Sequence, residues 1–171
     1  MTAVDKDIKK VISLFKKYHP IYWQVQPFCD VDLKYIGKGS YRQVYQIDNL
    51  PIVVKLPLGL DADMKECIEH SENEMDAILQ VKYAKKYAHL KKYLPKIYYY
   101  NLETGIIVMH KYKQTSTYSN RKTCKQAEKE ITDAFKSDLD ICKNFSVDGD
   151  KVILIDWGVL GSKSDWRQSG Y

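Results

Sequence analysis

The chain has 171 residues, of which 44% are hydrophobic and 29% are charged. These proportions exclude wholesale disorder, and the length allows one domain or two small lobes. The net charge of +5 comes largely from lysines in one central stretch, and such a bias attracts phosphates, acidic proteins or nucleic acid without choosing among them. The lysines of this stretch are Lys82, Lys85, Lys86, Lys91, Lys92 and Lys96.

Several partners and locations are disfavoured by the same sequence. Lysines at helical spacing usually form a solvated face, so we do not expect nucleic acid as a partner. The N-terminus has no hydrophobic signal core, and no apolar run is long enough to span a membrane. We expect a cytoplasmic protein with no membrane association. Cys29, Cys67, Cys124 and Cys142 are scattered without metal-site spacing, which favours reduced thiols.

The first predicted element is an amphipathic helix over residues 4–18, which would cover a core or meet a partner. Pro20 and Pro27 then break the chain before a strand, a glycine-rich turn and a second strand over 31–45. A short apolar strand follows at 52–56. The apolar positions of the helix are Val4, Ile8, Val11, Ile12 and Phe15.

The longest predicted helix covers residues 61–87, where apolar residues recur at helical spacing. Asp61 could cap its start or, after a break, Ser71 could do so with Glu74 three residues later. Strands at 96–100 and 106–110 form a hairpin after it. A polar connection over 114–120 leads to a last helix at 123–135.

A second hairpin is predicted between Asn144 and Asp156. Asp148-Gly149 is a strong turn signal, and the residues on either side of it are apolar as in paired strands. Folding about that turn brings Asn144 and Asp156 together at the open end. Their oxygens could hold Mg²⁺ against the phosphates of a nucleotide, because Mg²⁺ prefers a few hard ligands completed by water and phosphate.

The order of these elements resembles the protein kinase family. The stretch Tyr35 to Val44 is similar to the glycine-rich loop G-x-G-x-x-G-x-V, with Arg42 in place of the third glycine. Glycines let backbone N–H groups approach phosphates closely. By resemblance the loop residues that contact ATP are Ile36, Gly37, Lys38, Gly39, Ser40 and Val44.

The resemblance assigns further roles in the first half of the chain. Lys55 corresponds to the phosphate-binding lysine, and Glu74 to the helix glutamate that pairs with it, with Glu72 and Asp76 as rivals. Met109 corresponds to the gatekeeper, the residue that precedes the hinge between the two lobes of a kinase. The backbone of His110 and Tyr112 would then face the adenine.

In the second half, Asp156-Trp157-Gly158 resembles the metal-binding Asp-Phe-Gly motif, and Asn144 the second metal ligand. The catalytic aspartate is displaced, because Leu139 stands five residues before Asn144 where the pattern H-R-D-x-x-x-x-N has its aspartate. Asp138 and Asp140 flank that position. Asp138 is favoured as the base and Asp140 remains an alternative.

The resemblance implies an α+β fold in a single domain over 1–171: a helical extension at 1–29, a small lobe at 30–112 and a much reduced large lobe at 113–171. The small lobe would hold a five-stranded antiparallel sheet and one helix. The implied activity is ATP- and Mg²⁺-dependent transfer of phosphate to protein serine or threonine, by a minimal kinase of the phage or bacterial-effector type, acting in the host cytoplasm if so encoded.

Two other functions are compatible with the sequence. The displaced aspartate and the short large lobe also allow a pseudokinase that binds a partner protein, with or without nucleotide. A small-molecule kinase of the aminoglycoside type is less favoured, since such enzymes need a helical substrate lobe. In either protein-directed role the partner is a protein substrate or regulator, possibly from a host.

Overall fold

The computed structural model describes residues 3–17, 31–58, 63–113, 121–137, 144–148 and 151–160. The chain forms two compact units. The first contains residues 1–71 and 96–111, and the second contains 72–95 and 112–171. Helix α3 (Met64–Tyr83) contributes to both units, since the division falls between Ser71 and Glu72.

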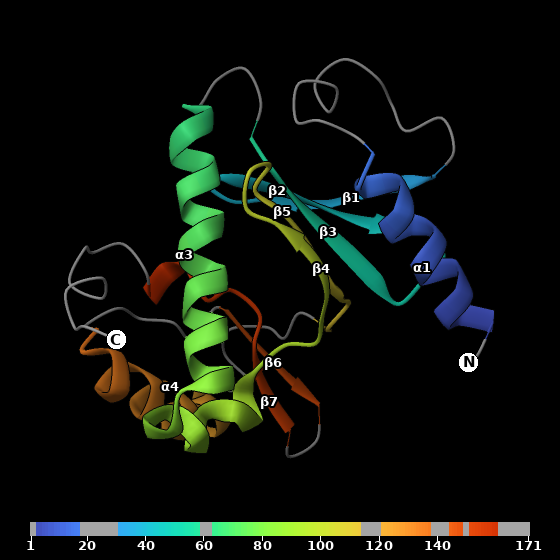
Figure 1. Cartoon of the computed structure of the whole chain (residues 1–171). Helices are drawn as coiled ribbons and strands as arrows, with labels where there is room; N and C mark the ends of the chain where they lie inside the picture. Colours follow the sequence, from blue (N-terminus) through green and yellow to red (C-terminus); the bar gives the residue numbers. More distant parts are fainter. Residues whose placement is uncertain are drawn as a thin grey trace. The chain divides into compact units, whose positions relative to one another are not determined.

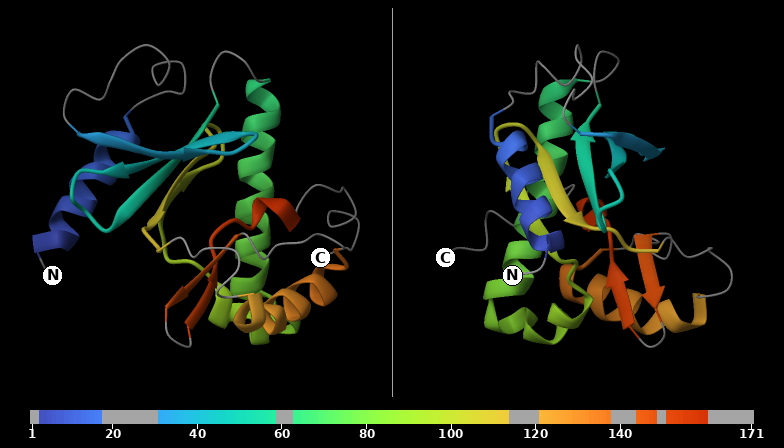
Figure 2. Two further views of the ribbon diagram at one scale, coloured as in Figure 1. Left: turned by 180° about the vertical axis from the view of Figure 1, so that it is seen from behind. Right: turned by 90° about the vertical axis from the view of Figure 1, so that its right-hand side faces the viewer.

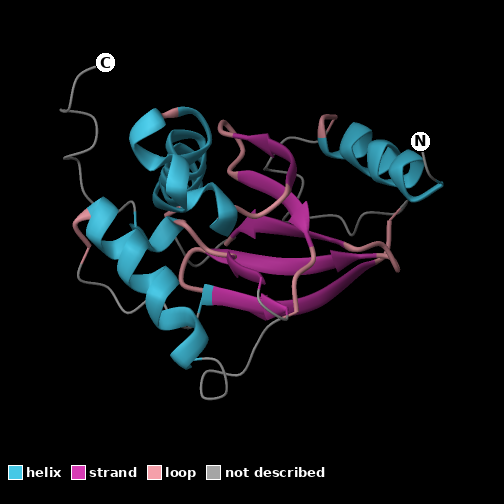
Figure 3. Cartoon of the chain, turned by 90° about the horizontal axis from the view of Figure 1, so that it is seen from below, coloured by secondary structure: helices cyan, strands magenta, loops and turns pink. Residues whose placement is uncertain are grey.

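The first unit is built on a five-stranded antiparallel sheet, drawn in magenta in Figure 3. Its strand order is β1-β2-β3-β5-β4, so that β3 is the central strand. The α+β class and the five predicted strands are therefore confirmed. The strands are β1 (Leu33–Lys38), β2 (Arg42–Ile47), β3 (Ile52–Pro57), β4 (Ile97–Asn101) and β5 (Ile106–His110).

Helix α1 (Ala3–Phe15) covers one face of this sheet. Figure 1 shows it, in blue, beside the strands. Its apolar positions Ile8, Val11 and Phe15 are at most 5% exposed, which confirms the predicted amphipathic helix. They pack with alternate residues of β3 and β5, because successive strand residues point to opposite faces. The sheet residues of this core are Ile47, Ile52, Val54, Leu56, Ile106 and Val108.

The boundaries of helix α3 differ from the prediction. Asp63 caps its start, since its side chain accepts a hydrogen bond from Lys65 N–H at 2.9 Å. Ser71 lies inside the helix and donates to the carbonyl of Cys67, so it is not a cap. Asp61 lies outside the described residues. The helix ends at Tyr83, and the segment from Lys85 to Tyr93 forms the 3₁₀ helix η1.

The second unit packs η1 against helix α4 (Arg121–Phe135) and the hairpin of β6 (Phe145–Asp148) and β7 (Lys151–Leu154). Figure 2 shows α4 and the hairpin next to each other in both views. The rings of Tyr87 and Phe135 stack at 5.0 Å between centroids. Phe135 in turn meets Trp157 edge-on at 6.0 Å. These aromatic contacts join η1, α4 and the segment after β7 within this unit.

No helix among the described residues is both long enough and apolar enough to cross a membrane. The two cysteines in the described ranges, Cys67 and Cys124, are buried free thiols, as predicted. Burial raises the pKa of both thiols, which keeps them protonated. Cys29 and Cys142 lie outside the described residues.

Candidate functional site

Three of the predicted nucleotide-binding residues form one row across the sheet of the first unit. Gly37 in β1 pairs with Val44 in β2, and Val44 pairs with Lys55 in β3. Residues directly opposite each other in an antiparallel sheet project to the same face. Val44 and Lys55 therefore share a face, and Gly37 adds no side chain to it. A Cβ atom placed on Gly37 would have no neighbour within 4 Å.

Met109 lies on this same face. It pairs with Val53, which precedes Lys55 by two residues and so projects in the same direction. Helix α1 packs on the opposite face, with Val54 and Val108. The sheet thus separates a core face from a second face, which carries the predicted lysine and the predicted pre-hinge residue. Both are buried, at 6% exposure for Lys55 and 2% for Met109.

The turn between β1 and β2 contains the remaining loop residues. Gly39 donates its N–H to the carbonyl of Arg42 at 2.8 Å, which closes the turn. Ile36 is the bulged residue of β1, where the register shifts, and it is 43% exposed. Lys38 and Ser40 are also exposed. The loop therefore presents its backbone and the side chains of Ile36, Lys38 and Ser40 to solvent, and its contact with ATP stays a prediction.

Arg42 is a residue whose placement the sequence did not reveal. It precedes Val44 by two residues in β2, so it lies on the face of Lys55, and it is only 5% exposed. Its positive charge lowers the pKa of Cys67, against the larger effect of burial. Because Arg42 precedes Val44 by two residues, the sequence could have predicted that both side chains project from the same face of the sheet. This face thus holds two buried cations, Arg42 and Lys55.

The segment after β5 was predicted to meet the adenine through its backbone. His110 donates its N–H to the carbonyl of Lys96 at 2.9 Å, and Lys111 donates to Pro51 at 2.9 Å. These two N–H groups are therefore used within the sheet. The imidazole of His110 lies near the Tyr98 hydroxyl, at 3.4 Å. Tyr112 is half-buried and begins the next stretch of the second unit.

Burial distinguishes the three candidate acids on helix α3. Glu74 is fully buried, whereas Glu72 and Asp76 are half-buried. A buried carboxylate is costly unless a cation or hydrogen-bond donors compensate its charge. Glu74 is therefore the acid with the greatest need of a cationic partner. Its pairing with Lys55 stays a prediction.

In the second unit, the hairpin brings the two predicted metal ligands to one end. The strand pairing runs from Asp148 with Lys151 to Phe145 with Leu154. It continues with a hydrogen bond of 2.7 Å from Ile155 N–H to the carbonyl of Asn144. Asn144 and Asp156 are thus neighbours across the open end. Asp148 pairs with Lys151 and therefore belongs to strand β6, whereas Gly149, the second residue of the predicted turn, lies outside the described residues.

Contacts on both sides fix the backbone around Asp156. Its Oδ1 accepts a hydrogen bond from Gly158 N–H at 3.1 Å, just before the short 3₁₀ helix η3 (Gly158–Leu160). Trp157 is fully buried, and its indole N–H donates to the carbonyl of Leu154 at 2.9 Å. Asp156 itself is half-buried. A buried tryptophan therefore anchors the chain next to a carboxylate that solvent can reach.

The donor chemistry of Asn144 and Asp156 fits Mg²⁺, which takes oxygen ligands and keeps several positions for water and phosphate. Within the described ranges, no group of three or more histidine, cysteine, aspartate or glutamate side chains could hold a metal ion by itself. Two protein ligands suffice where a nucleotide supplies the others. The candidate bases Asp138 and Asp140 lie outside the described residues.

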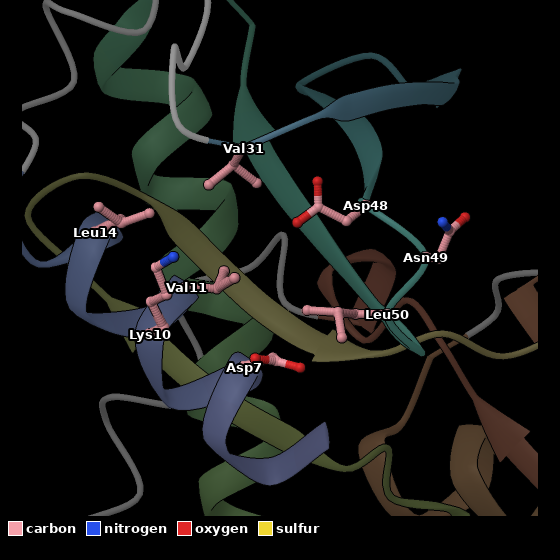
Figure 4. A pocket seen from close by; sticks show the side chains of 8 residues that line it. All are labelled: Asp7, Lys10, Val11, Leu14, Val31, Asp48, Asn49 and Leu50. Atoms are coloured by element: carbon pink, nitrogen blue, oxygen red, sulfur yellow. The ribbon is translucent and has the colours of Figure 1, made fainter. Parts of the chain in front are cut away.

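A cavity of about 280 Å³ lies elsewhere in the first unit, between α1 and the turn from β2 to β3 (Figure 4). Helix α1 covers the sheet face opposite Lys55, and none of the predicted nucleotide-binding residues lines this cavity. It is therefore not the predicted nucleotide site. The lining residues are Asp7, Lys10, Val11, Leu14, Val31, Asp48, Asn49 and Leu50.

Neither the models of protein families nor the curated proteins include a match to this chain.

Proposed function

We propose that the chain is a minimal protein kinase, which transfers the γ-phosphoryl group of ATP to serine or threonine hydroxyls with Mg²⁺. The observation that carries the proposal is the shared sheet face of Val44, Lys55 and Met109, beside Gly37 and the turn that contains Gly39. A surface that combines apolar side chains with the buried cations Arg42 and Lys55 suits a nucleotide base and its phosphates. The five-stranded sheet is compatible with the small lobe of a kinase.

Each residue has a defined task in this proposal. Lys55 positions the α- and β-phosphates, and the carboxylate of Glu74 orients Lys55. Asn144 and Asp156 hold the magnesium ion, which neutralises phosphate charge when bound. Met109, the backbone carbonyl of His110 and the backbone of Tyr112 contact the adenine, since the N–H of His110 already bonds to Lys96.

The transfer step needs a base near the acceptor. The hydroxyl oxygen attacks the γ-phosphorus, the bond from that phosphorus to the β–γ bridging oxygen breaks, and ADP leaves. Asp138 or Asp140 accepts the hydroxyl proton. Asp138→Asn and Asp140→Asn distinguish the two, because loss of the base lowers the transfer rate by about 10²–10⁴-fold.

The direct test is transfer of radiolabel from ATP to the chain itself or to host proteins. Lys55→Met removes the ammonium while keeping an apolar side chain of similar length, and Asp156→Ala removes a metal ligand. Both should abolish transfer, while Lys34→Ala, at an exposed lysine of β1, should not. Transfer that survives in a folded Asp156→Ala variant would contradict the proposal.

A pseudokinase is the second candidate function. It is favoured by Leu139, which occupies the position of the catalytic aspartate in the family pattern. This role predicts that ATP raises the melting temperature of the chain while no label is transferred, because a ligand that binds only the folded state stabilises it. Absence of both transfer and stabilisation would contradict the kinase and the nucleotide-binding pseudokinase alike.

A further inference from the structure

The positive charge of the chain is concentrated in twelve residues of the second unit. The segment from Lys82 to Tyr93 contains five lysines and no acidic residue. The rest of the chain has 22 lysines and arginines against 22 acidic residues, so the net charge of +5 equals these five lysines. A field from such a cluster steers anionic partners toward one place on the surface. The five are Lys82, Lys85, Lys86, Lys91 and Lys92.

The 3₁₀ helix η1 exposes most of these lysine side chains to solvent. Tyr87, Leu90 and Tyr93 are buried at intervals of three residues, which matches the three residues per turn of a 3₁₀ helix. The two remaining faces are exposed and basic. One carries Lys85 and Lys91, and the other carries Lys86, His89 and Lys92. We call the exposed side chains of Lys82, Lys85, Lys86, His89, Lys91 and Lys92 the lysine ridge.

Contacts within the second unit hold the ridge in place. Glu130 on α4 forms an ion pair with Lys92 at 2.9 Å and accepts a hydrogen bond from the hydroxyl of Tyr93 at 2.9 Å. The buried Tyr87 ring stacks on Phe135. Lys92 is thus partly neutralised, whereas Lys85 and Lys91 present their charge to solvent. A binding partner would meet cations that project from a pre-ordered backbone, which lowers the entropy cost of association.

The aromatic rings of the ridge argue against nucleic acid as the partner. Tyr87 and Tyr93 are buried, and the ammonium groups of Lys86 and Lys92 lie 4.7 and 4.8 Å from their ring centroids. They therefore offer no platform on which bases could stack. Tyr83 is 71% exposed, but Lys82 lies 5.3 Å from its ring centroid. The segment contains no arginine for bidentate contacts to phosphate or guanine.

An extended acidic peptide fits the ridge better. Residues three apart in a 3₁₀ helix are separated by roughly 6 Å, because the rise is about 2.0 Å per residue. Alternate side chains of an extended peptide are separated by roughly 6.6 Å on one face. Carboxylates at every second position would therefore match the three-residue repeat of η1, and on the face of Lys85 and Lys91 every other carboxylate would meet a lysine, because Ala88 lies between the two.

We propose that the lysine ridge docks an extended, acidic segment of a partner protein. This proposal does not depend on phosphoryl transfer, since it requires only the charge and order of η1. The probe is a short labelled peptide of alternating glutamate and serine, with a glutamine–serine peptide as its uncharged control. Binding to the full chain is measured by fluorescence anisotropy at low and at high salt.

The decisive variant is the double charge reversal Lys85→Glu and Lys91→Glu, which leaves Lys86 and Lys92 to hold Tyr87 and Glu130. It should weaken binding of the glutamate peptide about tenfold or more. The matched control is Lys6→Glu with Lys34→Glu, at exposed lysines of α1 and β1, which changes the net charge equally. The control should change the affinity less than about twofold, because these lysines lie outside the ridge.

Several results would overturn the proposal. These are no binding of the glutamate peptide at low salt, equal losses in the two double variants, and binding of the glutamine peptide with similar affinity. Tighter binding of a single-stranded oligonucleotide or of anionic lipid vesicles would assign the ridge to that partner instead. If the charge reversal unfolds the chain, Lys85→Gln with Lys91→Gln replaces it, with an expected loss of about threefold.

Discussion

Glu130 connects three side chains of the second unit. Hydrogen bonds from Gln126, Lys92 and Tyr93 stabilise its charged form and lower its pKa from 4.5 to about 2. Because the folded state binds the proton more weakly than the unfolded chain, Glu130 adds stability above pH 4.5. That stability is lost as the pH falls from 4.5 to about 2.

We therefore expect Glu130→Gln to lower the free energy of unfolding by about 1 kcal/mol at neutral pH, a modest value because solvent screens a partly exposed pair. The difference in the free energy of unfolding between this variant and the unmodified chain should decrease as the pH falls toward 2. Urea denaturation at several pH values measures this difference. Glu103→Gln, at an exposed glutamate between β4 and β5, is the control, and an equal effect there would contradict the assignment.

Two glycines of the first unit differ in whether their position tolerates a side chain. Gly105 has a φ of +65°, and a Cβ atom there would lie 2.9 Å from Cγ of Pro57 and 3.3 Å from Cα of Ile68. We expect Gly105→Ala to destabilise the chain by about 2 kcal/mol in urea denaturation. Gly37 has open space, so Gly37→Ala should leave stability unchanged while weakening stabilisation by ATP. Equal melting temperatures for the two variants would contradict this reading.

Among the elements, helix α1 completes the core of the first unit. The sheet face formed by Ile52, Val54 and Val108 would otherwise be open to water, and burying each large apolar side chain contributes about 1.5–3 kcal/mol. A sheet of this kind needs such a cover for stability. The role of the helix is therefore to cover the core, which was one of the two roles predicted for it.

This role predicts a difference between two positions of α1. Phe15 is 2% exposed, and Phe15→Ala should cost about 3 kcal/mol because it leaves a cavity. Val4 is 42% exposed, and Val4→Ala should change stability by less than about 0.5 kcal/mol. Unfolding in urea measures both. A small loss for Phe15→Ala would mean that the helix is not part of the core.

At the scale of the whole molecule, the residues proposed to bind ATP and Mg²⁺ are divided between the two units, since Lys55 belongs to the first and Asp156 to the second. Binding of ATP with Mg²⁺ should therefore stabilise the complete chain, by about 2.7 kcal/mol when the ligand is present at a hundred times its dissociation constant. The measurement is a melting curve with ATP, with and without excess Mg²⁺.

The Asp156→Asn variant should lose the magnesium-dependent part of this stabilisation, as should the unmodified chain with a chelator. Asp133→Asn, the same change at an exposed position of α4, serves as the control. If ATP raises the melting temperature equally with and without magnesium, and equally in the unmodified chain and the Asp156→Asn variant, Asp156 is not a metal ligand.

Much of the fold follows from local patterns. The five strands, α1, α4 and the second hairpin were predictable because alternation with period two and helical spacing are properties of short segments. The residue that caps α3 and the residue at which α3 ends could not be predicted in this way. Asp63 competes with Asp61 and Ser71 for the same role, and spacing does not decide which backbone N–H groups meet a carboxylate.

The candidate site was predictable only in part. Resemblance pointed to Lys55, Asn144 and Asp156, and burial then separated Glu74 from Glu72 and Asp76. The burial of Arg42 beside Val44 on the lysine face was missed, because the side facing Lys55 depends on how β2 pairs with β3. Pairing between strands is a long-range property that single segments do not encode.

By itself, the sequence determined the strands, the amphipathic helix and the concentration of lysines between Lys82 and Tyr93. Only the tertiary structure decided the register that aligns Gly37, Val44 and Lys55 in one row, with Ile36 bulged out. It alone also showed that all of these lysines except Lys82 lie on a 3₁₀ helix anchored by Glu130. The reason is that register and anchoring arise from contacts between residues far apart in the chain, and these form only when the whole chain folds.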